Sequence, residues 1–227
     1  MEARIREKGL IFNSEMVRAI LDGRKTQTRR PIKWKQTRFT EIGEREDGSK
    51  WPWSEDAEHA CDFWHPCPFG AVGDRIWVRE TWSSDFANYY PNDRVWYAAD
   101  NNRQLDIDMV DGVRGIYSPE SDVHVPFRWH PSIHMPRWAS RILLEITDVR
   151  VERLNAISEE DATAEGVPPA GSLLPDYLGT FLTPKGDFAT AKVAFQRLWE
   201  SIYGEESWKA NGWVWVISFK RVEGGAA

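Results

Sequence analysis

The sequence has few cysteines and no long apolar run. Cys61 and Cys67 are the only cysteines among 227 residues, which is too few for the disulfide framework of a small secreted domain. No apolar stretch approaches the ~20 residues of a membrane span, and the N-terminal residues are charged where a signal peptide needs an apolar core. We therefore expect a protein of the cytoplasm that is neither exported by a signal peptide nor inserted into a membrane.

The charge of the chain is unevenly distributed. The formal net charge is −6, which argues against a protein that coats nucleic acid, because neutralising phosphates supplies most non-specific affinity. One segment nevertheless has seven basic residues and no acidic one: Arg24, Lys25, Arg29, Arg30, Lys33, Lys35 and Arg38. This run is either a contact for phosphate or RNA, or a solvated basic loop.

Periodicity predicts an α+β fold. The apolar patterns indicate strands at 9–12, 26–32, 75–82, 95–99, 141–153 and 213–219, and helices at 14–22, 158–166 and from Asp187 to Gly204. Ser158 begins its helix as a capping residue followed by acids. We expect a single domain, 1–227, built on a small, mostly antiparallel β-barrel with surrounding helices. Long loop insertions are expected at about 33–68, 100–128 and 167–187.

Several motifs, taken in order, resemble a known domain. They are Gly23-Arg24-Lys25-Thr26-Gln27-Thr28-Arg29-Arg30, Gly73-Asp74 leading into Trp77-Val78-Arg79-Glu80-Thr81-Trp82, the segment Glu159 to Gly166, and the closing strand Trp213 to Lys220. Together they resemble the ASCH domain of the PUA-like superfamily over nearly the whole chain. The run from Trp129 to Arg141 is similar to the larger ASCH proteins of enterobacterial phages and prophages.

The resemblance implies a β-barrel whose cleft holds RNA or a modified nucleoside, and it brings no cofactor or metal. One smaller type in the superfamily is an amidohydrolase that removes the acetyl group of N4-acetylcytidine with a lysine, a threonine and a glutamate. By motif alignment these fall on Lys25, Thr28 and Glu165. The resemblance therefore implies that these three residues form a catalytic or ligand-binding site.

The chemistry of these residues leaves two roles open. An amide hydrolase needs a nucleophile, a base and an acid, which Thr28, Lys25 and Glu165 can supply. However, Lys25 follows a helix C-terminus, and both this dipole and a nearby Glu165 favour its ammonium form. Only burial would reverse these effects. Otherwise Lys25 is a cationic ligand contact and Thr28 a hydroxyl donor, or the residues form an ordinary surface salt bridge.

Other residues are candidates for ligand binding. Three of them belong to the basic run: Arg24, Arg29 and Arg30. Three others lie on a predicted strand that carries both bulky and charged side chains: Arg79, Glu80 and Trp82. Glu80 can accept from a base amino group and Arg79 can meet phosphate or stack on a base; the alternative is a cross-strand ion pair on a solvated face. Among 13 tryptophans, those nearest the basic run are candidates for base stacking: Trp34, Trp51 and Trp53.

A compact group of His59, Cys61, His65 and Cys67 contains ligand types that suit zinc. Its spacing is not that of the usual zinc fingers or ribbons. We expect reduced cysteines in a folded loop and no metal site. His124, His130 and His134 are expected to be structural.

Three functions remain open at this stage. The first is a binding module for a nucleotide within RNA or a modified base. The second is an enzyme, either an amidohydrolase on an acylated pyrimidine nucleoside or a metal-independent ribonuclease. The third is a phage-encoded regulator that binds a host protein through its insertions. The observation that would help most is whether Lys25, Thr28 and Glu165 converge in one pocket.

Overall fold

The computed structural model describes residues 5–33, 41–56, 61–84, 95–101, 107–110, 112–118 and 123–222. The chain divides into two compact units, each built from segments far apart in sequence. The first unit comprises Met1–Glu7, Ala19–Arg75 and Glu145–Arg221, and the second comprises Lys8–Arg18, Ile76–Leu144 and Val222–Ala227. The single domain with insertions stays a prediction.

The fold is mixed α+β, with mostly antiparallel strands and few helices, as expected from the sequence. A closed barrel is not found among the strands that the structure describes. None of the helices in the described residues combines the length and the apolar character needed to cross a membrane.

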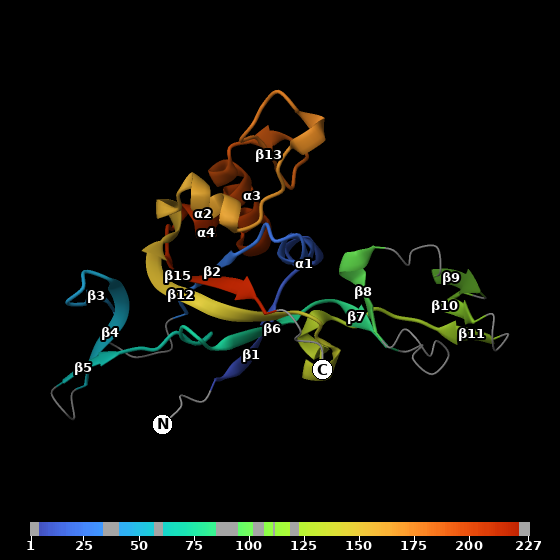
Figure 1. Ribbon diagram of the computed structural model, residues 1–227, viewed down its shortest axis with the longest axis horizontal. Coiled ribbons are helices and arrows are strands. Elements are labelled where there is room, and N and C mark those ends of the chain that lie inside the picture. The colour runs from blue at the N-terminus through green and yellow to red at the C-terminus, as the bar shows by residue number, and fades with distance from the viewer. Residues whose placement is uncertain are drawn as a thin grey trace. The chain divides into compact units, whose positions relative to one another are not determined.

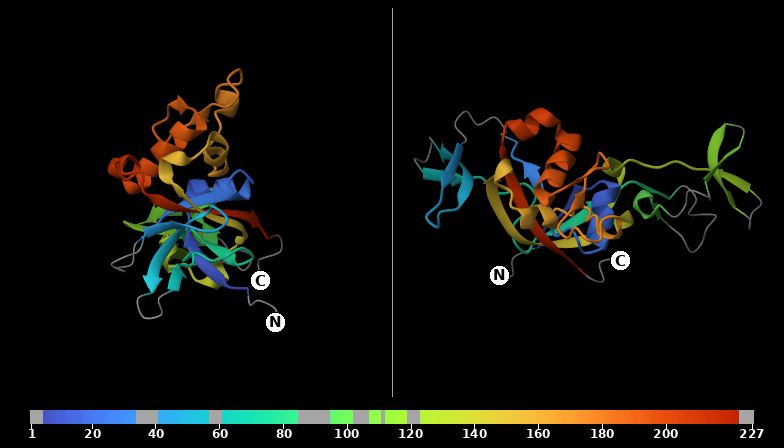
Figure 2. Two further views of the ribbon diagram at one scale, coloured as in Figure 1. Left: turned by 90° about the vertical axis from the view of Figure 1, so that its left-hand side faces the viewer. Right: turned by 90° about the horizontal axis from the view of Figure 1, so that it is seen from above.

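The first unit contains most of the helices (Figure 1). Its elements are β2 (Gln27–Pro31), β3 (Glu41–Glu44), β4 (Lys50–Asp56), β5 (Cys61–Trp64), most of β12 (Leu143–Arg153), α2 (Glu159–Ala164), β13 (Phe181–Leu182), β14 (Phe188–Ala189), α3 (Ala191–Tyr203), α4 (Glu205–Lys209) and β15 (Trp213–Arg221). Strands β12, β15 and β2 lie in that order in one sheet. The helices α2, α3 and α4 lie on one side of these strands (Figures 1 and 2).

The core of the first unit lies between these helices and β15. Val214 and Val216 point from one face of β15 into a cluster that includes Phe195 and Trp199 of α3. The predicted strand at 213–219 is therefore confirmed, but it is buried on both faces. Its other face carries Trp215, which is 3% exposed.

The second unit is richer in short strands. Its elements are β1 (Glu7–Ile11), most of α1 (Ser14–Leu21), most of β6 (Arg75–Arg79), β7 (Trp82–Ser83), β8 (Trp96–Tyr97), β9 (Ile107–Val110), β10 (Val113–Ser118) and β11 (Val123–Pro126). A sheet of β9, β10 and β11 contributes Ile116 to a cluster with Trp96 and Phe127.

Several sequence expectations need correction. The expected loop insertion at 33–68 contains the antiparallel sheet β3–β4–β5, and that at 100–128 contains β9–β10–β11. The helix expected from Asp187 begins only after Thr190, and the carboxylate of Asp187 bonds to Thr183 and Arg197. The cap at Ser158 is confirmed, because its hydroxyl accepts from the backbone N–H of Asp161 at 3.1 Å.

Gly166 ends α2 where two parts of the first unit approach closely. Its φ is +85°, which a residue with a side chain rarely adopts, and a Cβ there would lie 2.7 Å from Cβ of Lys25 and 2.9 Å from Cβ of Ala19. Glycine at this position thus lets the end of α2 approach the segment that carries Lys25.

We expect Gly166→Ala to lower the free energy of unfolding by about 2–4 kcal/mol, because it adds a clash to an unfavourable φ. Gly179→Ala is the matched control, since Gly179 has φ +82° and an added methyl group there would meet nothing within 4 Å. Urea unfolding of both variants measures the difference. An equal loss of unfolding free energy in the two variants would show that the close approach of Gly166 to Lys25 and Ala19 does not restrict the residue at this position.

Candidate functional site

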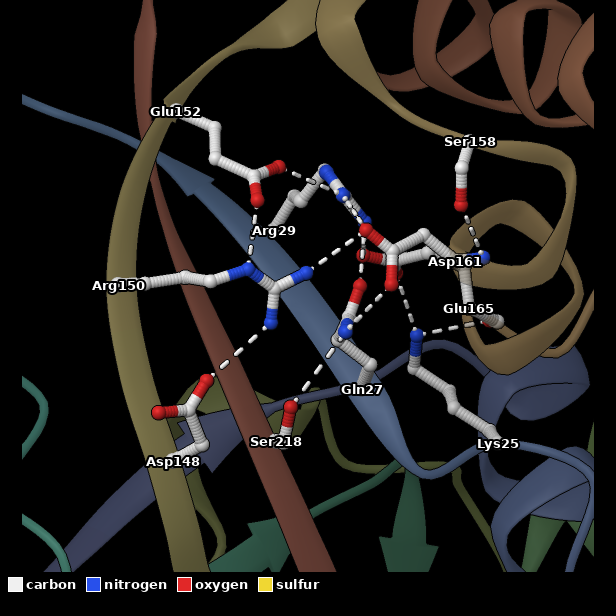
Figure 3. A network of polar contacts seen from close by, with 10 residues as sticks. All are labelled: Lys25, Gln27, Arg29, Asp148, Arg150, Glu152, Ser158, Asp161, Glu165 and Ser218. Carbon is white, nitrogen blue, oxygen red and sulfur yellow. Dashed lines mark hydrogen bonds and ion pairs between the residues drawn. The ribbon is translucent and has the colours of Figure 1, made fainter. Parts of the chain in front are cut away.

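Lys25 and Glu165 form a buried ion pair in the first unit. The backbone N–H of Lys25 donates to the carbonyl of Ala19 at 2.9 Å, which fixes the chain just after α1. Lys25 Nζ then donates to Glu165 Oε2 and to the Glu165 carbonyl, both at 2.8 Å. The side chains are 0% and 3% exposed, respectively, and Figure 3 shows the Lys25 amine directed at Glu165. The structure therefore brings together two of the three residues implied by the resemblance.

Arg29, on strand β2, also contacts the carboxylate of Glu165. Its side chain is 0% exposed and lies 3.3 Å from Glu165 Oε1, 2.7 Å from Asp161 Oδ2 and 3.1 Å from Glu152 Oε2. Gln27, two residues earlier on β2, donates to Asp161 Oδ1 at 3.1 Å. Residues two apart on a strand share a face, so β2 directs both side chains toward α2.

Strand β12 adds a second arginine at the rim of this group. Arg150 donates to Glu152 at 2.6 Å, to Asp161 at 2.7 Å and to Asp148 at 3.2 Å. Its side chain is 32% exposed, while those of Glu152 and Asp161 are 26% and 24% exposed. We call the following seven residues the Arg29 network: Lys25, Gln27, Arg29, Arg150, Glu152, Asp161 and Glu165.

Burial and charge shift two pKa values in this network. Desolvation lowers the pKa of Lys25 below its ordinary value of 10.5, and the opposing attraction of Glu165 does not cancel it. Repulsion by two nearby cations, Arg30 and Arg29, adds to this lowering. Burial alone would raise the pKa of Asp161, but hydrogen bonds from Arg29 and Gln27 outweigh it and lower that pKa.

Thr28 lies on the other face of β2. In the antiparallel register, Arg29 is opposite Val216 and Thr28 is opposite Ile217 of β15. Since directly opposed residues share a face, Thr28 points away from the side on which Arg29 meets Glu165. Thr28 is buried, at 2% exposure. The structure does not bring its side chain to the ion pair.

The remaining predicted residues of the basic run have different surroundings. Arg24 donates to the Gly166 carbonyl at 3.0 Å and to Asp22 at 3.1 Å, and its side chain is 33% exposed. Arg30 is half-buried on the Thr28 face of β2, opposite Trp215. Lys33 is exposed, whereas Trp34, Lys35 and Arg38 lie outside the described residues.

Arg79, Glu80 and Trp82 belong to the second unit. Arg79 Nε donates to the Ser132 carbonyl at 3.1 Å. Glu80 is 1% exposed and receives two hydrogen bonds of 3.0 Å from Arg141. Desolvation raises the pKa of Glu80 despite this partner. Glu80 thus forms an ion pair with a residue of another segment, as the alternative expectation had it, but the pair is largely buried instead of lying on a solvated face.

Trp82 packs within an aromatic group of the second unit. Its ring centroid lies 5.3 Å from that of His130 and 5.8 Å from that of Trp138. Trp82 is 8% exposed, whereas Trp138 is 61% exposed. Trp138 is therefore the more accessible ring of this group.

The histidine and cysteine group lies on and after β5. Cys61 is exposed and Cys67 buried, and both are reduced. His65 Nε2 lies 2.9 Å from Ser54 Oγ, and His59 falls outside the described residues. No cluster of three potential metal-binding side chains occurs in the described part of the chain.

Sequence reasoning missed the carboxylates of β12 and α2 that surround Arg29. A signal was present, because Asp148, Arg150 and Glu152 alternate along one strand face, and Asp161 stands in the first turn of α2. What no local pattern reveals is that these segments meet β2.

Comparisons of the chain with protein-family models, with curated proteins and with solved structures found no match.

The lowered pKa of Lys25 predicts a pH dependence of stability. Between the folded pKa and 10.5, the unfolded chain binds a proton that the folded chain does not, so stability rises with pH in that window. We expect the free energy of unfolding of the wild type, relative to Lys25→Met, to increase across it. Each tenfold fall in the proton affinity of Lys25 on folding changes the free energy of unfolding across this window by about 1.4 kcal/mol.

Urea unfolding at several alkaline pH values measures this difference. Lys33→Met, at an exposed position, controls for the loss of one positive charge. A difference between wild type and Lys25→Met that falls as the pH rises would mean that Glu165 holds Lys25 charged and that the inferred direction is wrong.

Proposed function

We propose that this chain recognises a nucleobase, as a modified nucleoside or within a short RNA, at the rim of the Arg29 network. The observation that carries the proposal is the buried ion pair of Lys25 and Glu165, which are 140 positions apart in the chain. A buried ion pair seldom stabilises a fold more than apolar residues would. Ionisable groups with shifted pKa values are also concentrated at functional sites.

The rim of the network offers hydrogen-bonding groups suited to a base. Asp161 and Glu152 are acceptors about one quarter exposed, and Arg150 beside them is a donor about one third exposed. A nucleobase presents amino donors and ring acceptors along one planar edge. Arg29, whose side chain is fully buried, holds both of these carboxylates in position.

The charges favour base recognition over extended contact with the RNA backbone. Arg29, a predicted ligand contact, already faces three carboxylates. Of the described cations in the basic run, Lys33 is exposed and Arg24 and Arg30 are half-buried. A phosphate next to the base can contact Arg24. The residues of the Arg29 network do not themselves form a continuous row of cations for the phosphates of an RNA strand.

The order of motifs from Gly23 to Lys220 supports an assignment to the ASCH domain of the PUA-like superfamily, with its barrel and its phage relatives, as part of the same proposal. A cytoplasmic location belongs to it as well. Two reduced cysteines are compatible with a reducing compartment.

We expect N4-acetylcytidine or cytidine to bind to the full chain and Asp161→Asn to weaken that binding about tenfold, because a hydrogen bond to a charged group is worth ~1.5–3 kcal/mol. Isothermal titration calorimetry measures the affinity. Glu206→Gln is the control, since Glu206 is exposed and pairs with Lys209 at 2.8 Å. Equal binding by wild type and Asp161→Asn would exclude this rim as the site.

A second function, amide hydrolysis, is favoured by the lowered pKa of Lys25. A neutral amine can take a proton from water as the water oxygen adds to the amide carbonyl. The C–N bond then breaks, and the proton passes from Lys25 to the leaving amine. Because Thr28 faces away from Lys25, water is the nucleophile in this mechanism. Glu165 stabilises the protonated form of Lys25.

Access limits this second function. The Lys25 side chain is 0% exposed, so a substrate carbonyl reaches Nζ only if neighbouring side chains of the network move. Recognition at the rim requires no such movement. The geometry therefore supports binding ahead of hydrolysis.

Incubation with N4-acetylcytidine, with release of cytidine followed by chromatography, tests hydrolysis. If it occurs, we expect Lys25→Met and Glu165→Gln to lower the rate by about 10²–10⁴-fold, the usual contribution of a general base. Thr28→Val keeps the side-chain shape and should retain the rate. Loss of activity in Thr28→Val would restore the threonine as nucleophile, and an inactive wild type would leave binding alone.

A further inference from the structure

The sheet β3–β4–β5 has one face built from tryptophans. In its register, Trp53 of β4 lies opposite Glu41 of β3 and Trp64 of β5, and Trp51 lies opposite Gly43. Directly opposed residues share a face, so the three indoles are on the same side. We call this side, which carries Trp51, Trp53 and Trp64, the tryptophan face.

Glycine at position 43 shapes this face. A Cβ on Gly43 would lie 3.0 Å from ring atoms of Trp64 and 3.1 Å from Cβ of Trp53. The missing side chain therefore lets the Trp64 ring lie close to β3. Each of the three tryptophans is half-buried, which leaves part of its ring accessible.

The same face is acidic. Glu41 opposes Trp53, and Glu55 opposes Asp62 at the next position on that side of the sheet. All three carboxylates are exposed, and none of them forms an ion pair with another residue in the described part of the chain. Asp62 Oδ1 does accept a hydrogen bond of 3.0 Å from Trp53 Nε1.

One arginine of the chain already occupies part of this face. The guanidinium carbon of Arg45 lies 4.0 Å from the Trp51 ring centroid and 5.4 Å from that of Trp64. Cations are attracted to the faces of indole rings, and arginine does so most often. Trp53, further along β4 and beside the carboxylates, has no such cation in the described residues.

We propose that the tryptophan face binds an arginine side chain from a basic segment of a partner protein. The guanidinium would stack on Trp53 as Arg45 stacks on Trp51, and its N–H groups would meet Glu41 or Glu55. Complementary charge identifies the occupant, because three exposed carboxylates attract a cation and repel phosphate. This argument is independent of the nucleobase site.

The proposal also bears on the predicted role of Trp51 and Trp53 in base stacking. An RNA strand on this face would bring its phosphates close to Glu41, Glu55 and Asp62. Like charges at such separations oppose binding. Stacking by itself is tolerant of the base but needs a positively charged groove for the backbone.

The experiment uses the full chain and two acetylated, amidated pentapeptides of alternating glycine and arginine or glycine and citrulline. Citrulline has the shape of arginine without its charge. Calorimetric titration should show binding at least about tenfold tighter for the arginine peptide. Glu41→Gln and Glu55→Gln should each weaken it about two- to fivefold, the range of an exposed ion pair, and Trp53→Leu should do so similarly.

Glu44→Gln is the matched control, because Glu44 opposes Lys50 on the other face of the same sheet and pairs with it. It should leave the affinity unchanged. The two glutamine variants keep side-chain size, so they test the proposal even if Trp53→Leu unfolds the sheet. Absent binding, equal affinity for the two peptides, an equal loss in Glu44→Gln, or competition by oligouridylate for the Trp53-dependent site would each overturn the proposal.

Discussion

Two cations buried side by side impose the main constraint on the first unit. Lys25 and Arg29 both have side chains of 0% exposure, and neither could be removed from water without carboxylates at hydrogen-bonding distance. Those carboxylates come from β12 and α2, more than 120 positions later in the chain. The approach of three distant segments is therefore tied to charge neutralisation as well as to apolar packing, and Gly166 provides the space for it.

Burial determines what Lys25 can do. Glu165 gives one oxygen to Lys25 and the other to Arg29, but desolvation outweighs the attraction of Glu165 and lowers the pKa of Lys25. From sequence, the helix dipole and a nearby Glu165 favour the ammonium form unless burial reverses them, and Lys25 is buried. The same burial that makes Lys25 a candidate base also closes it off from solvent, so the partly exposed rim is the site that we propose for recognition.

Much of the secondary structure was predictable, and the exceptions have physical causes. Periodicity identified α1, α2 and β15, and the cap at Ser158 was visible from the acids that follow it. The sheets at 33–68 and 100–128 were missed because their strands are short and only partly buried, so polar residues dilute the alternation. At the site, motif alignment brought Lys25 to Glu165, but β-strand alternation turned Thr28 away. Which carboxylates neutralise Arg29 depends on tertiary contacts that no local pattern encodes.

The charge distribution also changes meaning once the contacts are known. From sequence, the basic run looked like a positive patch on an acidic protein, yet its central arginine is neutralised inside the fold. Under the proposed function, selectivity would come from short-range hydrogen bonds at the rim of the Arg29 network rather than from long-range attraction of a polyanion. The tryptophan face differs in charge, because exposed carboxylates lie beside half-buried indole rings. The two proposed recognition surfaces therefore suit different ligands, since the tryptophan face would attract a cation and repel the phosphates that accompany a base in RNA.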